Sequence, residues 1–344
     1  MLARTPLVDG HNDLAWAIRE SKLGPAGYDL RARAPGHTDL ARLKTGRVGA
    51  QLWSLYVPAD GPRHLFVRTQ LEQFDLAREV IARYPESLGL VLTADELEHE
   101  FRHGRVAGLL ALEGGHVIDD SLALLRTYHA LGARAMTLTH TASTRWADAA
   151  GQPPRHGGLT SFGEDVVREM NRLGMLVDLS HVSDATMDDA LRVSAAPVVF
   201  THSSARALTD VPRNVPDDVL RRLPANGGLV MVAFVPGFVS RAAADRKKGE
   251  SPRATLAHVA DHIEHVRRVA GVDHVGLGSD FDGMVAVPEG LEDVSTFPAL
   301  LAELARRGWS DEELGKLAGA NFLRVLRAVE ATARRLRAPA APPR

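Results

Sequence analysis

Short apolar runs alternate along almost the whole chain with longer segments in which apolar residues recur at helical spacing. A short apolar run is typical of a buried strand, and a repeat of three to four residues is typical of an amphipathic helix. The pattern predicts eight strands, at Pro6–Asp9, Gly49–Val57, Val106–Leu112, Ala135–Leu138, Met175–Leu179, Val198–Thr201, Gly228–Phe234 and His274–Leu277.

Helices are predicted between these strands and after the last one. They cover Arg68–Arg83, Ala94–His103, Ser121–Leu131, Phe162–Leu173, Asp184–Val193, Pro216–Leu223, Thr255–Ala270, Phe297–Arg307 and Asp311–Arg337. Strands that alternate with helices indicate a parallel sheet, and eight of them favour a closed α/β fold, the (β/α)8 or TIM barrel. A doubly wound open sheet is the alternative, but no G-x-G-x-x-G turn follows the first strand.

Length and composition agree with one large globular domain. The 344 residues are 45% hydrophobic and 24% charged, and barrels of this size form single domains. We expect one catalytic barrel over residues 1–337 and a disordered Pro/Ala-rich tail at 338–344. The formal net charge of -2 gives no electrostatic argument for nucleic acid or an anionic membrane. The sequence has no apolar run of signal-peptide or membrane-spanning length.

The chain has no cysteine. A metal could therefore be held only by His, Asp and Glu. The absence of disulfides is compatible with the cytoplasm, where we expect this protein to act.

Polar side chains that could bind a metal stand at or just past the ends of six predicted strands. They are His11, Asp13, Glu113, His140, His181, His202 and Asp280. Each has an ordinary explanation when taken alone, as a loop histidine, a helix-capping carboxylate or a turn residue. In a (β/α)8 barrel, however, the carboxyl ends of all strands meet at one face, where active sites are built. Together these residues predict a metal site.

Two metal ions close together need a bridging group. A carboxylated lysine can bridge, but the lysines Lys22, Lys44, Lys247, Lys248 and Lys316 all fall in predicted loops or helices. Glu113 is the only glutamate at a predicted strand end, and its two oxygens could bridge instead. His11, Asp13 and Glu113 would then hold one metal, and Glu113, His181 and His202 the other, with a shared water or hydroxide as nucleophile.

Three further residues are candidates for catalysis or substrate binding. Asp280 could take a proton from the nucleophile and pass it to a leaving amine. His140 could bind the substrate carbonyl oxygen as negative charge develops. Arg213 follows the sixth predicted strand, and its guanidinium could bind a substrate carboxylate or form an ion pair that fixes the loop.

Several of these segments together resemble the membrane (renal) dipeptidase family of binuclear zinc peptidases. The similar segments are Asp9–Asp13, Leu112–Gly115, Met136–His140, Val177–His181, Thr201–Ala205, Arg213–Asp217, Gly278–Gly283 and Gly319–Phe322. They occur in the family's order and extend over Leu7–Leu326.

The resemblance implies a zinc dipeptidase that forms homodimers and accepts L-L and L-D dipeptides. It implies the metal ligands proposed above, with Asp280 as acid/base and with His140 and Arg213 in contact with substrate. The chain departs from the mammalian members, which are lipid-anchored and disulfide-linked, and so is similar to soluble bacterial members. Ala233 stands where we expect Asn in many relatives.

Some alternatives stay open at this point. The same barrel could act on cyclic amides, lactones or phosphoesters, or it could bind metal without catalysis. Trp53, Tyr56, Arg145 and Trp146 are candidates for shaping the pocket, although core packing explains Trp53 and Trp146 equally well.

Overall fold

The computed structural model describes residues 1–246 and 253–338. Lys247, Lys248 and the tail residues 339–344 therefore lie outside the described residues. The strands are β1 (Leu7–Asn12), β2 (Val48–Tyr56), β3 (Leu88–Leu90), β4 (Val106–Glu113), β5 (Ala133–Thr137), β6 (Leu176–Asp178), β7 (Val199–Phe200), β8 (Leu229–Val232) and β9 (Val275–Leu277).

The strands close into a parallel barrel, so the (β/α)8 prediction is confirmed. Around the ring the order is β1-β2-β4-β5-β6-β7-β8-β9, with β9 pairing back onto β1. The sequence pattern missed β3, a three-residue strand that pairs only with the start of β4 and takes no part in closure.

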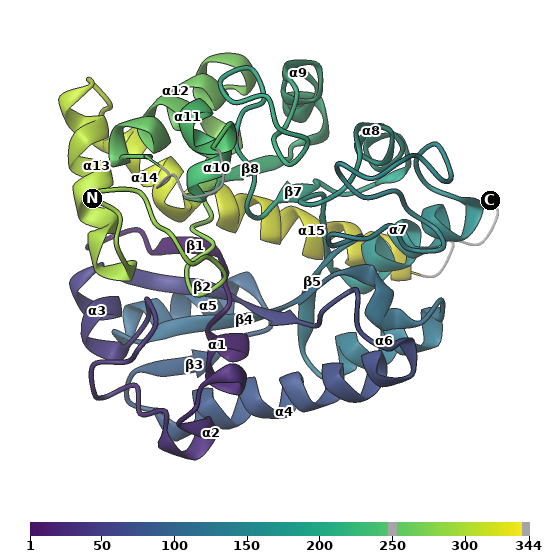
Figure 1. Cartoon of the computed structure of the whole chain (residues 1–344), viewed down its shortest axis with the longest axis horizontal. Helices are drawn as coiled ribbons and strands as arrows, with labels where there is room; N and C mark the ends of the chain where they lie inside the picture. The colour runs from purple at the N-terminus through teal and green to yellow at the C-terminus, as the bar shows by residue number, and fades with distance from the viewer. Residues whose placement is uncertain (247–252, 339–344) are drawn as a thin grey trace.

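The helices lie around the barrel, with α4 and α6 along its lower side and α9, α12 and α13 along its upper side in Figure 1. Their bounds are α1 Leu14–Glu20, α2 Gly24–Gly27, α3 Leu40–Thr45, α4 Phe66–Arg83, α5 Ala94–Arg102, α6 Leu122–Ala130, α7 Ser161–Leu173, α8 Asp184–Val193, α9 Asp217–Asn226, α10 Pro236–Val239, α11 Arg241–Ala244, α12 Leu256–Ala270, α13 Phe297–Arg306, α14 Asp311–Gly315 and α15 Asn321–Arg337. The short helices α1, α2, α3, α10 and α11 were not predicted, because they are too short to show a helical repeat.

The last predicted helix, Asp311–Arg337, is wrong as a single element. A π-helical turn at Lys316–Ala320 separates α14 from α15. Gly319 lies so close to β1 that a Cβ there would be 2.2 Å from the carbonyl oxygen of Pro6. The chain must therefore adjust locally to fit against the barrel.

Helix α15 covers the end of the barrel where the strands begin. Asn321 donates to the carbonyl oxygen of Val272, in the turn before β9, and to that of Val275, the first residue of β9. Its buried residues, such as Phe322 and Val325, belong to the same cluster as Leu52 and other strand residues. This end is closed, and the opposite end, where the strands finish, is left for the site.

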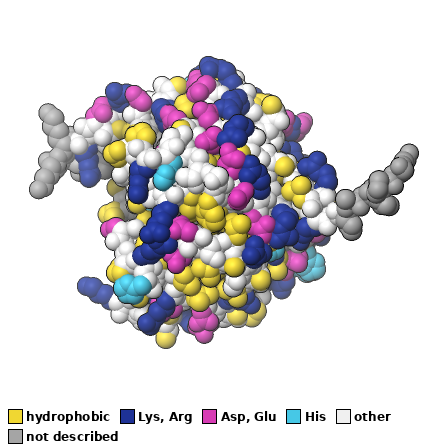
Figure 2. Space-filling view, turned by 90° about the vertical axis from the view of Figure 1, so that its right-hand side faces the viewer, with side chains coloured by type: hydrophobic (Ala, Val, Ile, Leu, Met, Phe, Trp, Pro, Cys, Tyr) yellow, Lys and Arg dark blue, Asp and Glu magenta, His cyan; other side chains and the backbone are white. Residues whose placement is uncertain are grey.

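The outer face in Figure 2 mixes basic and acidic side chains around a central hydrophobic area. This mixture agrees with the near-neutral net charge of -2. Among the described residues, no helix combines the length and the apolar character that crossing a membrane requires.

Candidate metal centre

The site residues come from six strands of the barrel and lie at its carboxyl end. His11 is in β1 and Asp13 directly follows it, while Glu113 is the last residue of β4. His140, His181, His202 and Asp280 lie two or three residues beyond the ends of β5, β6, β7 and β9. All seven side chains predicted from the strand ends are therefore brought to one place.

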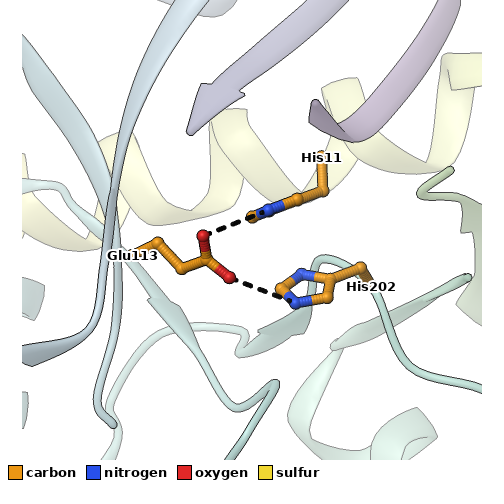
Figure 3. Close-up of side chains that lie close together, drawn as sticks. All are labelled: His11, Glu113 and His202. Atoms are coloured by element: carbon orange, nitrogen blue, oxygen red, sulfur yellow. Dashed lines mark ion pairs between the residues drawn. The ribbon is translucent and has the colours of Figure 1, made fainter. Parts of the chain in front are cut away.

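Glu113 lies at the middle of the site, and its two oxygens face different partners. Oε2 is 3.4 Å from Nε2 of His11, and Oε1 is 3.2 Å from Nε2 of His181. Oε1 is also 3.6 Å from Nε2 of His202. Figure 3 shows the carboxylate between the rings of His11 and His202. A carboxylate in this position could bridge two cations.

The remaining residues complete two groups around that carboxylate. Nε2 of His11 is 3.2 Å from Oδ2 of Asp13. The ligand atoms of His11, Asp13 and Asp280 all lie within 4.8 Å of one another. On the other side, Nε2 of His181 is 2.8 Å from Nε2 of His202. His140 lies beside this second group, with Nε2 3.5 Å from Oε1 of Glu113. His140, predicted to contact substrate, is thus as close to Glu113 as the predicted ligands are.

Backbone geometry at the strand ends aims these side chains inward. His181 and Asp280 have φ values of 68° and 70°, a left-handed conformation that residues other than glycine adopt infrequently. Gly283 is required by space, because a Cβ there would be 2.2 Å from Oδ2 of Asp13 and 2.7 Å from Oδ1 of Asp280. Strained backbone of this kind is concentrated at functional sites.

The protonation states fit a cation site. Burial, with the nearby Arg213, holds the pKa of His181 well below its usual range, and burial with His11 does the same for His202. Both rings are therefore neutral, the form that binds metal. Burial would lower the pKa of His11 too, but Glu113 and Asp13 raise it well above 6.5. The two carboxylates thus stabilise a positive charge at that position.

The geometry around one nitrogen supports the same interpretation. Within the described part of the chain, the buried Nε2 of His11 forms no well-aligned hydrogen bond, although Oδ2 of Asp13 and Oε2 of Glu113 lie 3.2 and 3.4 Å away. Buried polar atoms without a partner are rare in native proteins and call for an explanation such as an ion. Borderline N and O donors of this kind suit zinc. The residues present therefore fit a metal centre.

Burial raises the pKa of Asp280, as it does that of Asp13, whereas His11 keeps the pKa of Glu113 well below its usual range despite burial. Burial, reinforced by Asp13 and Glu113 and opposed by His11, raises the pKa of Asp280 to about 8. Its backbone N–H donates to the carbonyl oxygen of His11, which ties it to β1. The carboxyl group is placed next to the His11 and Asp13 side of the site. It can hold or release a proton near neutral pH.

Arg213 lies in the loop between β7 and α9, beside the second group. Its guanidinium donates to the hydroxyl of Ser203 and to the carbonyl oxygen of His202, both at 3.2 Å, and lies 5.0 Å from the ring of Phe238. Burial lowers its pKa to about 10, so it remains cationic at neutral pH. Among the described residues, no ion pair to a carboxylate fixes this guanidinium.

The sequence alone did not identify one supporting residue, Ser54. Ser54 of β2 donates to Oε2 of Glu113 at 2.8 Å and so fixes the orientation of that carboxylate. Ser54 lies two residues after Leu52 and therefore on the same inward side of β2. This period of two was the signal available in the sequence. The ring of Tyr56, which was a candidate for shaping the pocket, lies 4.9 Å from the ring of His140. Trp53 and Trp146 are both 1% exposed and pack in the core.

The lysine alternative has no support among the described residues. Lys44 is in α3, Lys316 is in the π-helical turn, and Lys22 follows α1. None of them lies at a strand end.

Comparison with known proteins places the chain in a family. The model of the membrane dipeptidase family, peptidase family M19, matches residues 1–340. Dipeptidase 3 of Rattus norvegicus is 47% identical over 94% of this chain and 65% of its own length. Dipeptidase verJ of Clonostachys rogersoniana is 44% identical over 96% of this chain and 86% of its own. The chain thus spans just under two thirds of the rat protein.

Solved structures agree. The family M19 metallopeptidase described as dipeptidase AC is 29% identical, with a TM-score of 0.86 over 95% of this chain and 99% of its own. A metallopeptidase from Rhodobacter sphaeroides, liganded with a phosphinate mimic of the dipeptide L-Ala-D-Ala, is 28% identical, with a TM-score of 0.83 over 95% and 99% of the two chains. Family membership implies a metal cofactor. The chain belongs to the membrane dipeptidase family, peptidase family M19.

Proposed function

We propose that this chain is a zinc-dependent dipeptidase that hydrolyses the peptide bond of L-L and L-D dipeptides. One observation carries the proposal: the two oxygens of Glu113 face different ligand-type side chains, Oε2 facing His11 and Oε1 facing His181, with His202 close to both His11 and Glu113. His11, Asp13 and Glu113 would hold one zinc, and Glu113, His181 and His202 the other. When bound, the two ions would acidify a shared water and polarise the peptide carbonyl.

The remaining residues supply the other needs of the reaction. Asp280 would take the proton of the attacking water and deliver it to the leaving amine. His140 would donate to the carbonyl oxygen as that oxygen becomes negative. Arg213 would bind the free carboxylate of the dipeptide, since its guanidinium is held beside His202.

The experiment that tests this function is a panel of L-L and L-D dipeptides given to protein stripped of metal and then reconstituted with zinc. We expect hydrolysis that returns with two zinc ions per chain. The panel includes a lactone, a cyclic amide and a phosphoester. If one of those three compounds were hydrolysed and no dipeptide were, the result would favour a different metal-dependent hydrolase of the same fold.

Replacing Arg213 by alanine should raise KM for dipeptides roughly 30- to 100-fold, the effect of losing a hydrogen bond between charged groups. The same dipeptides with an amidated C-terminus lack the carboxylate and should be affected much less. Steady-state kinetics on each pair of substrates measures the difference.

Arg206 provides the control for Arg213. It braces the same loop by donating to the carbonyl oxygen of Asn214 and pairs with Asp184. Arg206→Ala should therefore affect acid and amide substrates equally. The same equal effect in Arg213→Ala would show that Arg213 only fixes the loop.

Metal binding should release protons. The pKa of His11 lies well above 6.5 without metal, and that of Asp280 is about 8, so both groups are protonated at pH 7. Zinc competes directly for the nitrogen of His11, and its positive charge favours loss of the proton from the neighbouring Asp280. Its apparent affinity should therefore rise as pH increases from 6.5 towards 8 and fall at lower pH. Titration calorimetry in buffers of different ionisation enthalpy counts the protons, and an affinity independent of pH would contradict the assignment.

The proposal extends to assembly as a homodimer. Membership of the family supports it, and light scattering in solution would measure the mass against the 37.2 kDa of one chain.

A further inference from the structure

A further buried carboxylate, that of Asp178, lies behind the metal centre at the end of β6. It is 2% exposed, and its side chain accepts four hydrogen bonds. Oδ1 accepts from the backbone N–H groups of Ser180 and Thr201, each at 3.0 Å. Oδ2 accepts from the hydroxyls of Thr137 at 2.7 Å and Thr201 at 2.6 Å. Asp178 therefore ties together β5, β6 and β7.

The hydroxyl of Thr201 also contacts the next residue, His202. Its oxygen is 2.9 Å from Nδ1 of that ring. A hydroxyl has one proton, and a carboxylate oxygen can only accept. Because Thr201 gives its proton to Asp178, its oxygen accepts from His202. Nδ1 of His202 must then carry the hydrogen, which leaves the lone pair of Nε2 directed at His181 and Glu113.

We propose that Asp178 and Thr201 are positioning residues that set the tautomer and orientation of His202, so that its Nε2 can bind metal. This inference rests on the proposed metal centre, because His202 must be a ligand. Hydrogen-bond partners of this kind behind a ligand histidine are worth about 10- to 100-fold in metal affinity. The effect should be confined to the metal held by His181 and His202.

The chain contains the same arrangement a second time, without the histidine. Oδ1 of Asp9 accepts from the backbone N–H of Ser279, and Oδ2 accepts from the hydroxyl of Ser279, both at 2.8 Å. Here the hydroxyl oxygen accepts from the backbone N–H of Phe281 at 3.1 Å. Ser279 thus joins β9 to β1 as Thr201 joins β7 to β6. Its hydroxyl also lies 3.2 Å from the backbone carbonyl oxygen of His11, but this contact involves no ring nitrogen and so sets no tautomer.

The test is Thr201→Val, which keeps the shape of the side chain and removes the hydroxyl. Zinc affinity is measured by competition with a chelator, on protein whose folding is checked by circular dichroism. We expect one of the two zinc ions to bind about 10- to 100-fold more weakly and the other to be unchanged. Thr201→Ser keeps the hydroxyl and, unlike Thr201→Val, should keep the zinc affinity of the wild type.

Asp178→Asn provides a second route to the same result. Its amide NH₂ would donate to Thr201, whose proton would then turn to Nδ1 of His202 and favour the wrong tautomer. We expect the same selective loss of one zinc. Ser279→Ala is the matched control, and it should leave both zinc affinities within about threefold of wild type, in line with a merely structural hydroxyl.

The outcomes separate the two proposals. Unchanged zinc affinity in both Thr201→Val and Asp178→Asn would overturn the role of Asp178 and Thr201 while leaving the metal centre intact. Equal losses in Thr201→Val and Ser279→Ala would also overturn it, because they would show a general loosening of the barrel mouth. A wild-type chain that binds fewer than two metals and hydrolyses no dipeptide would overturn the metal centre and this inference together.

Discussion

Glu113→Gln is expected to reduce the zinc content from two ions per chain to one at most and to lower kcat about 10³-fold. Glutamine has the size of glutamate, but it offers one neutral oxygen in place of two anionic ones. It cannot bridge the groups that Glu113 now faces through Oε2 and Oε1. Losing one of two metal ions removes several kcal/mol of transition-state stabilisation, which corresponds to a rate loss of this size.

Metal analysis and steady-state kinetics on one dipeptide measure both effects. Glu72→Gln is the control, since Glu72 lies on the surface of α4 and pairs with Arg19 and Arg68. It should keep two zinc ions and full activity. A Glu113→Gln protein that retains two zinc ions and its activity would refute the bridging role.

Asp280→Asn is expected to lower kcat about 10²- to 10⁴-fold while the zinc content stays at two, because general acid–base catalysis contributes in this range. Asparagine tolerates the left-handed backbone at φ 70° as well as aspartate does, so the turn should keep its shape. The amide cannot take a proton from the attacking water. KM should change little, because Asp280 acts mainly in the chemical step.

A neighbouring carboxylate controls for damage to this turn. Asp282 also has a left-handed backbone, at φ 66°, and its carboxylate accepts from the backbone N–H of His37 at 2.6 Å. Asp282→Asn should keep kcat within about tenfold of wild type, as expected for a residue that supports the turn only. If Asp280→Asn behaved in the same way, proton transfer would have to be assigned to another group.

The barrel could be predicted because its signals are local. Each buried strand is a short apolar run, and helix α8 has the predicted bounds Asp184–Val193. The residues of the candidate site could also be predicted from the strand ends, because all parallel strands of a barrel finish at one face. The short helices and β3 could not be predicted, because three to seven residues are too few to show a period.

The supporting residues of the site depend on the tertiary structure. Ser54 reaches Glu113 because β2 and β4 pair in a register that places Tyr56 opposite Glu113. That register arises from the packing of strands more than 50 residues apart in sequence, and a local pattern carries no information about it. The hydrogen bond of Thr201 to Asp178, 23 residues away in sequence, likewise depends on the pairing of β6 with β7.

The sequence by itself determined the fold class and the set of side chains available at the strand ends, because both follow from local periodicity and from the topology of parallel strands. Only the tertiary structure decided how those side chains are grouped. It placed both oxygens of Glu113 between the two groups, brought His140 as near as the predicted ligands, and positioned Asp178 behind His202. Distances of a few ångströms between strands are set by register, barrel closure and left-handed backbone at His181 and Asp280, all of which are properties of the folded chain.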